Sequence, residues 1–355
     1  MGASILPSVV IVGAGISGLA LGQALRERGH MPILLERARG VGGRCATRRF
    51  GGWPVDHGVP FLHGRDSEFL AVLDSVSDAT PIHGWPHRRI GGGLPCQPEA
   101  FEGEDRLLAF REGLTRFPKH LARSLAVRLD SKVRSLRPLP GEARLAVTLE
   151  SGEEIRAGVV VLTMPAPSAL DLIASSGLDR ESPAVAGARP VLEQIRTLSC
   201  LTVIARYGDD APVPDWDACY PTTSSMVHVI LHDSTKRAPG APRTLVIQGR
   251  PRFSREYLEK PPAEWAKELL WEAGEFAGSW MEHPVESQEH VWRNARVDTT
   301  SELAAPLALR LENGATLAFC GDGFSPAGGA EGAFRSGRSL ASRIETLHEA
   351  PSRVS

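Results

Sequence analysis

The sequence lacks the features that mark several protein classes. Its 355 residues contain no uninterrupted apolar run of the roughly 18 residues that a membrane-spanning helix needs. The five cysteines are odd in number and no CxxC pair occurs, so neither a disulfide framework nor a metal site is expected. A formal net charge of −2 lacks the positive excess typical of nucleic-acid-binding proteins. Internal repeats and low-complexity tracts are also absent.

The start of the chain lacks targeting signals as well. It has no cationic leader followed by a small-residue cleavage site, so no signal peptide is predicted. Leu6 stands where a myristoylation signal needs Ser or Thr. The scattered cysteines fit a reducing, cytoplasmic setting best. We expect a small-molecule substrate as partner, and the sequence leaves the oligomeric state open.

What the sequence does contain is a βαβ unit at its beginning. The apolar, β-branched residues 8–12 predict a strand buried on both faces, as in a parallel sheet. Helical periodicity follows over residues 19–28 and stops at Gly29. A second strand is predicted over residues 32–35, and it ends at Glu36.

The rest of the chain predicts an α/β fold with two domains. Helices are expected at 67–76, 113–125, 263–276 and 329–346, and strands at 127–136, 159–163, 198–206, 225–232, 244–249 and 316–320, with a hairpin at 144–155. A discontinuous Rossmann-like domain is predicted to comprise residues 1–80, 112–166 and 296–346. A mixed-sheet α+β substrate domain would comprise 81–111 and 167–295, and 347–355 would form a disordered tail.

Residues 13–18, GAGISG, form a GxGxxG motif between the first strand and the first helix. Gly13 permits a tight turn, Gly15 lets backbone approach a pyrophosphate, and Gly18 lets the helix pack on the strand. The amides of Ile16 and Ser17 would then face the phosphates at the helix N-terminus. A glycine turn that binds nothing is the alternative.

An acidic residue and a second glycine pair follow this motif. The Glu36 carboxylate can accept hydrogen bonds from both hydroxyls of an adenosine ribose, and it would repel a 2′-phosphate. Gly42 and Gly43 precede Arg44, so backbone and guanidinium groups can converge on one anion. A solvated basic loop is the other interpretation of this segment.

This series resembles the glutathione-reductase-type flavoproteins of the amine oxidase, phytoene desaturase and renalase group. Their fingerprint runs from the glycine loop through the acid and GGR to an Asp-x-Gly, here Asp56-His57-Gly58. The resemblance implies a non-covalently bound FAD, with Arg44 at the pyrophosphate. The residues expected to contact it are Gly13, Gly15, Ile16, Ser17, Gly18, Glu36, Arg37, Gly43, Arg44, Gly58, Val59, Phe61, Val133, Asp322, Gly332 and Ala333.

The C-terminal segment is similar to the closing motif of the same flavoproteins. Cys320-Gly321-Asp322 ends a predicted strand, and residues 328–337, GGAEGAFRSG, open a helix. In the group, the Asp holds the ribityl or phosphate region and the helix N-terminus points at the flavin C2 carbonyl. A helix dipole there would stabilise the negative charge that hydride transfer places on the flavin.

Within the group, the chain is most similar to bacterial renalase-like proteins. Residues 56–66, DHGVPFLHGRD, resemble their DxGAQYFTxRD stretch, and residues 290–295, HVWRNA, resemble HRWxYA. The resemblance implies an oxidoreductase that oxidises dihydronicotinamide isomers and passes electrons to oxygen or another acceptor. Substitutions at Pro60, Phe61, His63 and Asn294 leave open a flavin oxidase or dehydrogenase of a secondary metabolite or amine. A redox-silent FAD-binding protein is a remote alternative.

An amine substrate is less favoured by the residues before Glu331. Amine oxidases usually place aromatic residues there, where this chain has Pro326, Ala327, Gly328 and Gly329.

No catalytic residue is identified from the sequence, but candidates for the substrate pocket are. Alternation over residues 226–232 predicts that His228, Ile230 and His232 share one strand face. His290 and Trp292 are expected to share another, where packing in the core is the alternative. The candidates are His63, His228, His232, His290 and Trp292. Basic residues that could receive a phosphorylated substrate are Arg65, Arg88, Arg89, Lys236 and Arg237.

Overall fold

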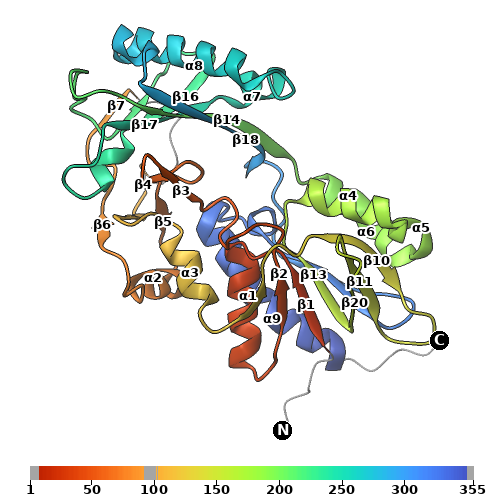
Figure 1. Cartoon of the computed structure of the whole chain (residues 1–355). Coiled ribbons are helices and arrows are strands. Elements are labelled where there is room, and N and C mark those ends of the chain that lie inside the picture. The colour runs from red at the N-terminus through yellow and green to blue at the C-terminus, as the bar shows by residue number, and fades with distance from the viewer. Residues whose placement is uncertain (1–7, 92–100, 102, 350–355) are drawn as a thin grey trace. The chain divides into compact units, whose positions relative to one another are not determined.

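A computed structural model describes residues 8–91, 101 and 103–349 of the chain (Figure 1). The chain divides into two compact units. The first unit comprises Met1–Gly43, Phe117–Thr197 and Val297–Ser355, and the second comprises Arg44–Arg116 and Leu198–Arg296. This division differs from the predicted domains mainly in two segments, because residues 44–80 belong to the second unit and residues 167–197 to the first; residues 112–116 and 296 also lie in the second unit.

The first unit is built on a six-stranded sheet with the order β19-β20-β13-β1-β2-β9. Its strands are β1 (Val9–Val12), β2 (Ile33–Leu35), β9 (Ala126–Arg128), β13 (Val159–Leu162), β19 (Leu307–Arg310) and β20 (Thr316–Phe319). Neighbouring strands are parallel except β19, which is antiparallel to β20. The Rossmann-like α/β architecture predicted from the sequence is therefore confirmed.

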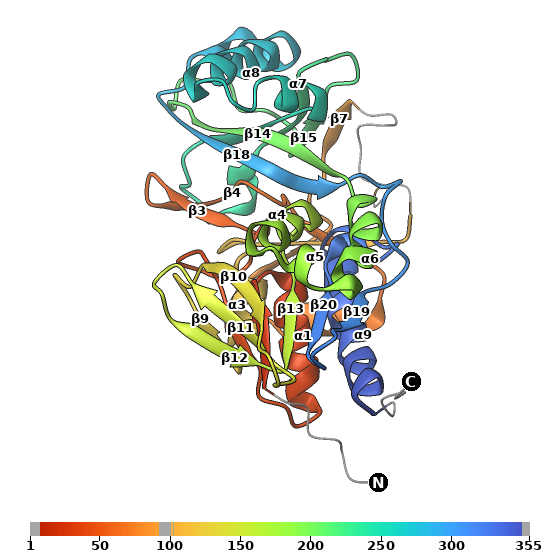
Figure 2. The ribbon, with the colours of Figure 1, turned by 90° about the vertical axis from the view of Figure 1, so that its right-hand side faces the viewer.

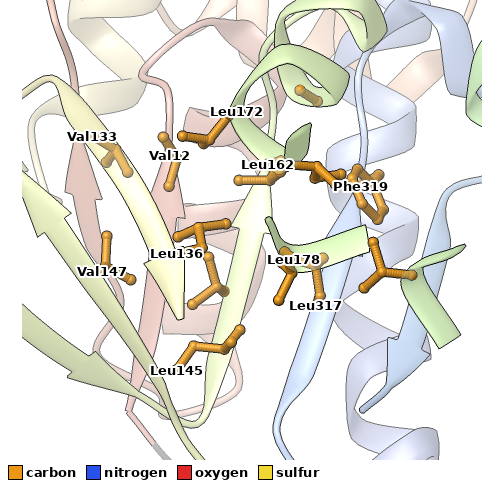
Figure 3. Close-up of a cluster of buried hydrophobic side chains, with 14 of the residues drawn as sticks. Val12, Val133, Leu136, Leu145, Val147, Leu162, Leu172, Leu178, Leu317 and Phe319 are labelled. Carbon is orange, nitrogen blue, oxygen red and sulfur yellow. The ribbon is translucent and has the colours of Figure 1, made fainter. Parts of the chain in front are cut away.

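The two faces of this sheet are covered differently. On one face, Val12, Leu162 and Phe319 belong to one buried cluster with side chains of a three-stranded antiparallel sheet, such as Leu136 and Val147 (Figure 3). That smaller sheet comprises β10 (Val133–Pro138), β11 (Leu145–Leu149) and β12 (Glu154–Ala157), and it contains the predicted hairpin. On the other face, helix α1 (Ile16–Glu27) packs beside α9 (Gly329–Glu349).

Two segments of the first unit differ from the sequence-based prediction. The single strand expected over 127–136 is two strands, β9 and β10, in different sheets, because the chain turns at Asp130 with a positive φ of 50°. Residues 166–193, for which the sequence predicted no element, form three helices. These are α4 (Ala166–Ser176), α5 (Leu178–Glu181) and α6 (Pro183–Glu193), and Leu172, Leu178 and Leu192 bury their side chains in the first unit's core.

The second unit is built on a six-stranded mixed sheet with the order β18-β14-β17-β16-β15-β7. Its strands are β7 (Arg89–Gly91), β14 (Thr197–Arg206), β15 (Ala218–Tyr220), β16 (Val227–Leu231), β17 (Thr244–Gly249) and β18 (Glu286–Val297). Helices α7 (Pro251–Glu256) and α8 (Pro262–Ala277) lie on one face (Figure 2). Trp265 and Leu269 of α8 pack there against Leu245 and Ile247 of β17.

The strands β3 (Thr47–Phe50) and β4 (Trp53–Asp56) form a hairpin. It lies against the opposite face of the large sheet, where Arg48 of β3 donates a hydrogen bond to His290 of β18. A further three-stranded sheet comprises β5 (Leu62–Gly64), β8 (Arg106–Phe110) and β6 (Pro81–His83), and α2 spans Ser67–Asp74. Helix α3 (Arg116–Ala122) contains the boundary between the units. Among the described residues, no helix is long and apolar enough to cross a membrane.

The predicted tail from residue 347 lies partly in α9, which continues to Glu349, and residues 350–355 lie outside the described residues.

Candidate functional site

The glycine loop forms a tight turn between β1 and α1. Gly13 adopts a φ of +112°, and a Cβ there would lie 2.5 Å from Oγ1 of Thr163. A Cβ on Gly18 would lie 2.2 Å from the Gly13 carbonyl oxygen. By contrast, a Cβ on Gly15 would meet nothing within 4 Å. The loop is therefore closed towards the protein at two glycines and open at the third, which is the position where backbone must approach a ligand.

The start of helix α1 is suited to an anion. Gly15 is the N-cap residue, and no described side chain caps the helix. Amides in the first turn of a helix have no intrahelical partner, so those near Ile16 and Ser17 are available to a phosphate. The second glycine pair lies against this loop, since Gly42 donates its amide to the Ala14 carbonyl (2.9 Å).

Glu36 is buried directly after β2, with 8 % of its surface exposed. Its Oε2 accepts a hydrogen bond from the Ala14 amide (2.8 Å), and its Oε1 accepts one from the Ala38 amide (2.9 Å). A carboxylate has about four acceptor sites, so these two bonds leave capacity for ribose hydroxyls. The residues of the loop thus fit an adenine dinucleotide.

The first unit brings the C-terminal motif to the same helix start. The Ser17 hydroxyl donates to Sγ of Cys320 (3.0 Å), and the Ser336 hydroxyl accepts from the Gly321 amide (3.1 Å). Burial raises the pKa of Cys320 to about 12, which makes its thiol unreactive. Asp322 is buried beside it, in the short helix η4 (Asp322–Phe324). The glycine loop and the closing motif are therefore joined, as the expectation of one shared cofactor requires.

Two further predicted cofactor contacts of the first unit lie in different settings. The Val133 side chain is packed in the core of the small sheet, and Arg37 is exposed. Gly332 and Ala333 lie in the first turns of α9, where the Gly332 amide donates to the Gly328 carbonyl (2.6 Å).

In the second unit, Arg44 and the Asp-His-Gly motif are neighbours. The Arg44 carbonyl accepts from the Val59 amide (3.1 Å), and a Cβ on Gly58 would lie 2.2 Å from that carbonyl oxygen. Only glycine permits this approach. The Gly58 carbonyl in turn accepts from Nε2 of Gln248 on β17 (2.8 Å), which ties the motif to the large sheet.

Asp56 belongs to a buried cluster of four charges. Its Oδ2 lies 2.8 Å from both Nζ of Lys236 and Nη2 of Arg237. Asp233 pairs with the same two cations at 2.9 and 2.7 Å. Burial alone would raise the Asp56 pKa, but Lys236 and Arg237 outweigh it and hold the pKa well below its usual range. Lys236 also donates to the Pro60 carbonyl (2.8 Å), so this neutral cluster fixes both ends of residues 56–60.

This cluster corrects the role suggested for Lys236 and Arg237. Neither cation is positioned to receive a substrate phosphate, because both are buried and bound to Asp56 and Asp233. Two other candidates, Arg65 and Arg88, are exposed and paired with Asp105 and Asp215. Arg89 stacks over the Phe101 ring at 4.1 Å from its centroid.

Three rings meet where residue 57 approaches β18. His290 and Trp292 share a strand face, as predicted, with ring centroids 4.3 Å apart. His57 lies 4.9 Å from His290 and 5.4 Å from Trp292, and its carbonyl accepts from Nε1 of Trp292 (3.0 Å). Arg48 of β3 donates to Nδ1 of His290 (3.1 Å).

Both imidazoles of this ring cluster are uncharged near neutral pH. Burial, followed by the charge of Arg48, lowers the pKa of His57 to about 3 and that of His290 to about 4. Nδ1 of His57 is buried without a hydrogen bond of good geometry, and a weak one to the Val55 backbone raises the His57 pKa slightly against these effects.

The prediction that His228, Ile230 and His232 share one face of β16 is wrong. A β-bulge between Val227 and Val229 shifts the register, so that Val227 and Ile230 both point into the core under α8. His228 therefore does not share a face with Ile230. It accepts a hydrogen bond on Nε2 from Arg296 (3.0 Å), whereas His232 is buried beyond the strand, next to Trp216 (6.3 Å between centroids).

The structure thus brings only part of the candidate set together. His290 and Trp292 are in contact, and His228 lies on the same sheet. His63 lies apart on β5, where Nδ1 pairs with Asp105 (2.9 Å). Phe61 is buried between Trp85 and Phe101 (6.1 and 5.5 Å). Within the described residues, no group of three or more His, Cys, Asp or Glu side chains could hold a metal ion.

Comparison with known families accounts for most of the chain. Residues 11–76 match the NAD(P)-binding Rossmann-like domain. Residues 84–345, which are more than half of the chain, match the family described as flavin containing amine oxidoreductase. The chain belongs to the flavin-containing amine oxidoreductase family. FAD is therefore its cofactor, and the predicted class of FAD-dependent oxidoreductase is confirmed.

Solved structures share the fold of this amine oxidoreductase over nearly its whole length. A putrescine oxidase variant has a TM-score of 0.70 at 15% identity, and covers 96% of this chain and 99% of its own. Cyclohexylamine oxidase from Brevibacterium oxydans has a TM-score of 0.68 at 14% identity, and covers 97% of this chain and 100% of its own. At these identities the likeness concerns the fold alone.

Curated relatives of the amine oxidoreductase match only a short segment. A putative flavin-containing monoamine oxidase of Mycobacterium tuberculosis is 38% identical over 76 residues, which are 21% of this chain and 17% of the relative. A probable polyamine oxidase of Arabidopsis thaliana is 42% identical over 65 residues, 18% of this chain and 13% of its own. The chain thus matches less than a fifth of the length of either relative.

Several functional residues of the amine oxidoreductase were not identified from the sequence. Arg48, Gln248 and Arg296 contact His290, Gly58 and His228 through side chains that lie far away along the sequence, which periodicity does not reveal. One feature of the sequence does indicate the buried charge cluster. Asp233 precedes Lys236 and Arg237 by three and four residues, the spacing at which side chains of a helical turn meet.

Proposed function

We propose that the protein oxidises a reduced small molecule by hydride transfer to N5 of FAD, with oxygen or another acceptor reoxidising the flavin. The observation that carries this proposal is the joined dinucleotide site of the first unit. There the glycine loop, the buried Glu36 and the closing motif share one helix start. FAD supplies the redox chemistry when bound, and the protein supplies binding, orientation and exclusion of water.

Dihydronicotinamide isomers are our leading substrate class. A dihydropyridine donates hydride without losing a proton to the protein, whereas oxidation of an amine or alcohol normally needs a base. The ring cluster offers only weak bases, because the pKa of His57 is about 3 and that of His290 about 4. Their neutral rings can instead position a planar substrate by stacking and hydrogen bonding.

An amine is the second candidate. It is supported by the family to which residues 84–345 belong, although the residues before Glu331 argued against it. Amines of the kind named for the structural relatives, putrescine and cyclohexylamine, are the substrates to try first.

The test is anaerobic mixing of the FAD-loaded protein with one donor at a time, followed by the visible flavin spectrum. We expect rapid bleaching with at least one dihydronicotinamide isomer and recovery of colour on admission of oxygen. Bleaching by the amines alone would replace the first substrate class by the second. If no donor of either class bleaches the flavin, the proposed reaction is wrong.

A further inference from the structure

Among the residues that the structure describes, Arg48 of the second unit is a half-buried arginine without an acidic partner. Its Nη2 donates a hydrogen bond to Nδ1 of His290 (3.1 Å), and within those residues its guanidinium forms no ion pair. Lys236 and Arg237 differ, because both pair with the acids of the buried charge cluster. A guanidinium has several N–H donors arranged as a fork, so the contact with His290 leaves most of them available to a ligand.

The electrostatic surroundings of Arg48 agree with this lack of an acidic partner. Burial lowers the pKa of Arg48, whereas a neighbouring carboxylate would raise it. After burial, the charge of Arg48 is the largest cause that lowers the pKa of His57 and of His290. The opposing effect of Asp56 on the His57 pKa is smaller. Both imidazoles are therefore neutral, and both experience a positive potential from Arg48.

The rings beside Arg48 lie on the sheet face opposite α8. Val291 packs into the core under α8, and successive side chains of a strand alternate between its faces. His290 and Trp292 therefore face away from α8, and Arg48 reaches His290 on that side. Both rings are only partly buried. Glu289, which precedes His290 on β18, falls on the same face as Val291. We call Arg48, His57, His290 and Trp292 the arginine–ring site.

We propose that the arginine–ring site binds an anionic group of the substrate, either a carboxylate or a phosphate, and holds a planar part of the substrate against its rings. The Arg48 guanidinium matches both anionic groups with paired, charge-assisted hydrogen bonds, and Trp292 and His290 add ring surface beside it. A substrate whose only charge is a protonated amine would be repelled. This inference rests on the proposed function for the identity of the ligand as a substrate, but binding of the anion is independent of turnover.

The test is calorimetric titration of the FAD-loaded protein at fixed ionic strength, so that the dinucleotide site is already filled. Benzoate and phenyl phosphate serve as the carboxylate and phosphate probes. Benzamide presents the same ring without a charge, and benzylamine presents it with a positive charge. We expect saturable binding of at least one anion, roughly tenfold or more weaker binding of benzamide, and none of benzylamine. The anion that binds more tightly identifies the substrate group.

Variants localise the binding. Arg48→Gln removes the guanidinium and is expected to weaken anion binding roughly ten- to hundredfold. Arg48→Lys keeps the charge but loses the fork, so a smaller loss is expected, and it replaces the first variant if that one does not fold. The matched control is Arg49→Gln, which removes the same charge from the next residue of β3. Arg49 is exposed and donates to the Gly52 carbonyl in its own hairpin (3.1 Å), so anion binding should be unchanged.

The outcomes separate this inference from the proposed function. Equal anion affinities of the Arg48 and Arg49 variants, or binding of benzamide or benzylamine as tightly as the anions, would overturn the arginine–ring site as an anion site. Anion binding that depends on Arg48 supports the inference even if no donor bleaches the flavin. Conversely, bleaching without any anion binding would leave the proposed function intact and refute this inference.

Discussion

At the scale of single residues, the candidate site depends on side chains whose neighbours fix their charge. Glu36 is a buried acid that two backbone amides stabilise. His57 is a buried base and His290 a half-buried one, and Arg48 helps to keep both neutral. These residue types follow from the sequence. The ionisation of the two histidines does not, because it depends on Arg48, which for His290 is far away along the chain.

Replacing Glu36 by Gln should weaken FAD binding. Gln is nearly the same size, but it loses the negative charge and turns an amide NH2 towards the Ala14 or Ala38 amide. A charge-assisted hydrogen bond contributes about 1.5–3 kcal/mol, so we expect roughly ten- to hundredfold weaker binding. The measurement is quenching of FAD fluorescence on titration with the apoprotein.

The control for this variant is Glu142→Gln, which removes an acid that is exposed on the same unit. It should leave the FAD affinity unchanged. Similar losses in both variants would mean that net charge, and not the Glu36 contacts, governs binding.

At the scale of helices and strands, the sequence was most informative where burial is uniform. The apolar run 8–12 is β1, and the runs at 159–163 and 316–320 are β13 and β20 of the same parallel sheet. It was least informative where local geometry breaks a regular pattern. The bulge in β16 and the positive φ at Asp130 each changed an assignment, and neither leaves a periodic signal.

Helix α1 can lie against α9 only because residue 337 has no side chain. A Cβ on Gly337 would lie 2.3 Å from the Ser17 carbonyl oxygen. We expect Gly337→Ala to push the helices apart, to lower the free energy of unfolding by about 1–3 kcal/mol and to weaken FAD binding at the Ser17 turn. Urea unfolding and FAD titration measure the two effects.

Gly187 in α6 provides the matched control, because a Cβ there meets nothing within 4 Å. Gly187→Ala should stabilise the protein by roughly 0.5–1 kcal/mol through helix propensity. If Gly337→Ala is also stabilising, then the close contact between α1 and α9 does not exclude a side chain at residue 337.

At the scale of the whole molecule, both units are discontinuous in sequence, and their boundaries were predicted poorly. The physical reason lies in where the boundaries fall. Those near residues 116, 197 and 296 lie within one residue of an end of α3, β14 and β18. No change of composition marks them, so the domains predicted from the sequence place residues 44–80 and 167–197 differently. The glycine loop and the closing motif, at opposite ends of the sequence, both lie in the first unit.

The pH dependence of stability is a property of the whole molecule. His57, His228 and His290 have folded-state pKa values of about 3, 3 and 4, against 6.5 for exposed histidine. Between these values the unfolded chain binds protons that the folded chain does not. Stability should therefore be complete above pH 6.5 and fall as the pH is lowered towards 4, by at most about 1.4 kcal/mol per pH unit for each histidine.

Urea midpoints between pH 7 and pH 5 measure this loss before most carboxylates titrate. The variant His57→Gln should show a shallower decline than the parent protein. An unchanged slope would mean that His57 is protonated in the folded state.

The contact between Ser17 and Cys320 also determines when the cofactor can be captured during biosynthesis. The glycine loop leaves the ribosome long before its partner strand β20 and helix α9, because Ser17 and Cys320 are 303 residues apart in the sequence. Pairing of β13 with β20 therefore has to wait until β20 has been synthesised. FAD capture consequently has to wait as well, and termination before β20 would leave the flavin site incomplete.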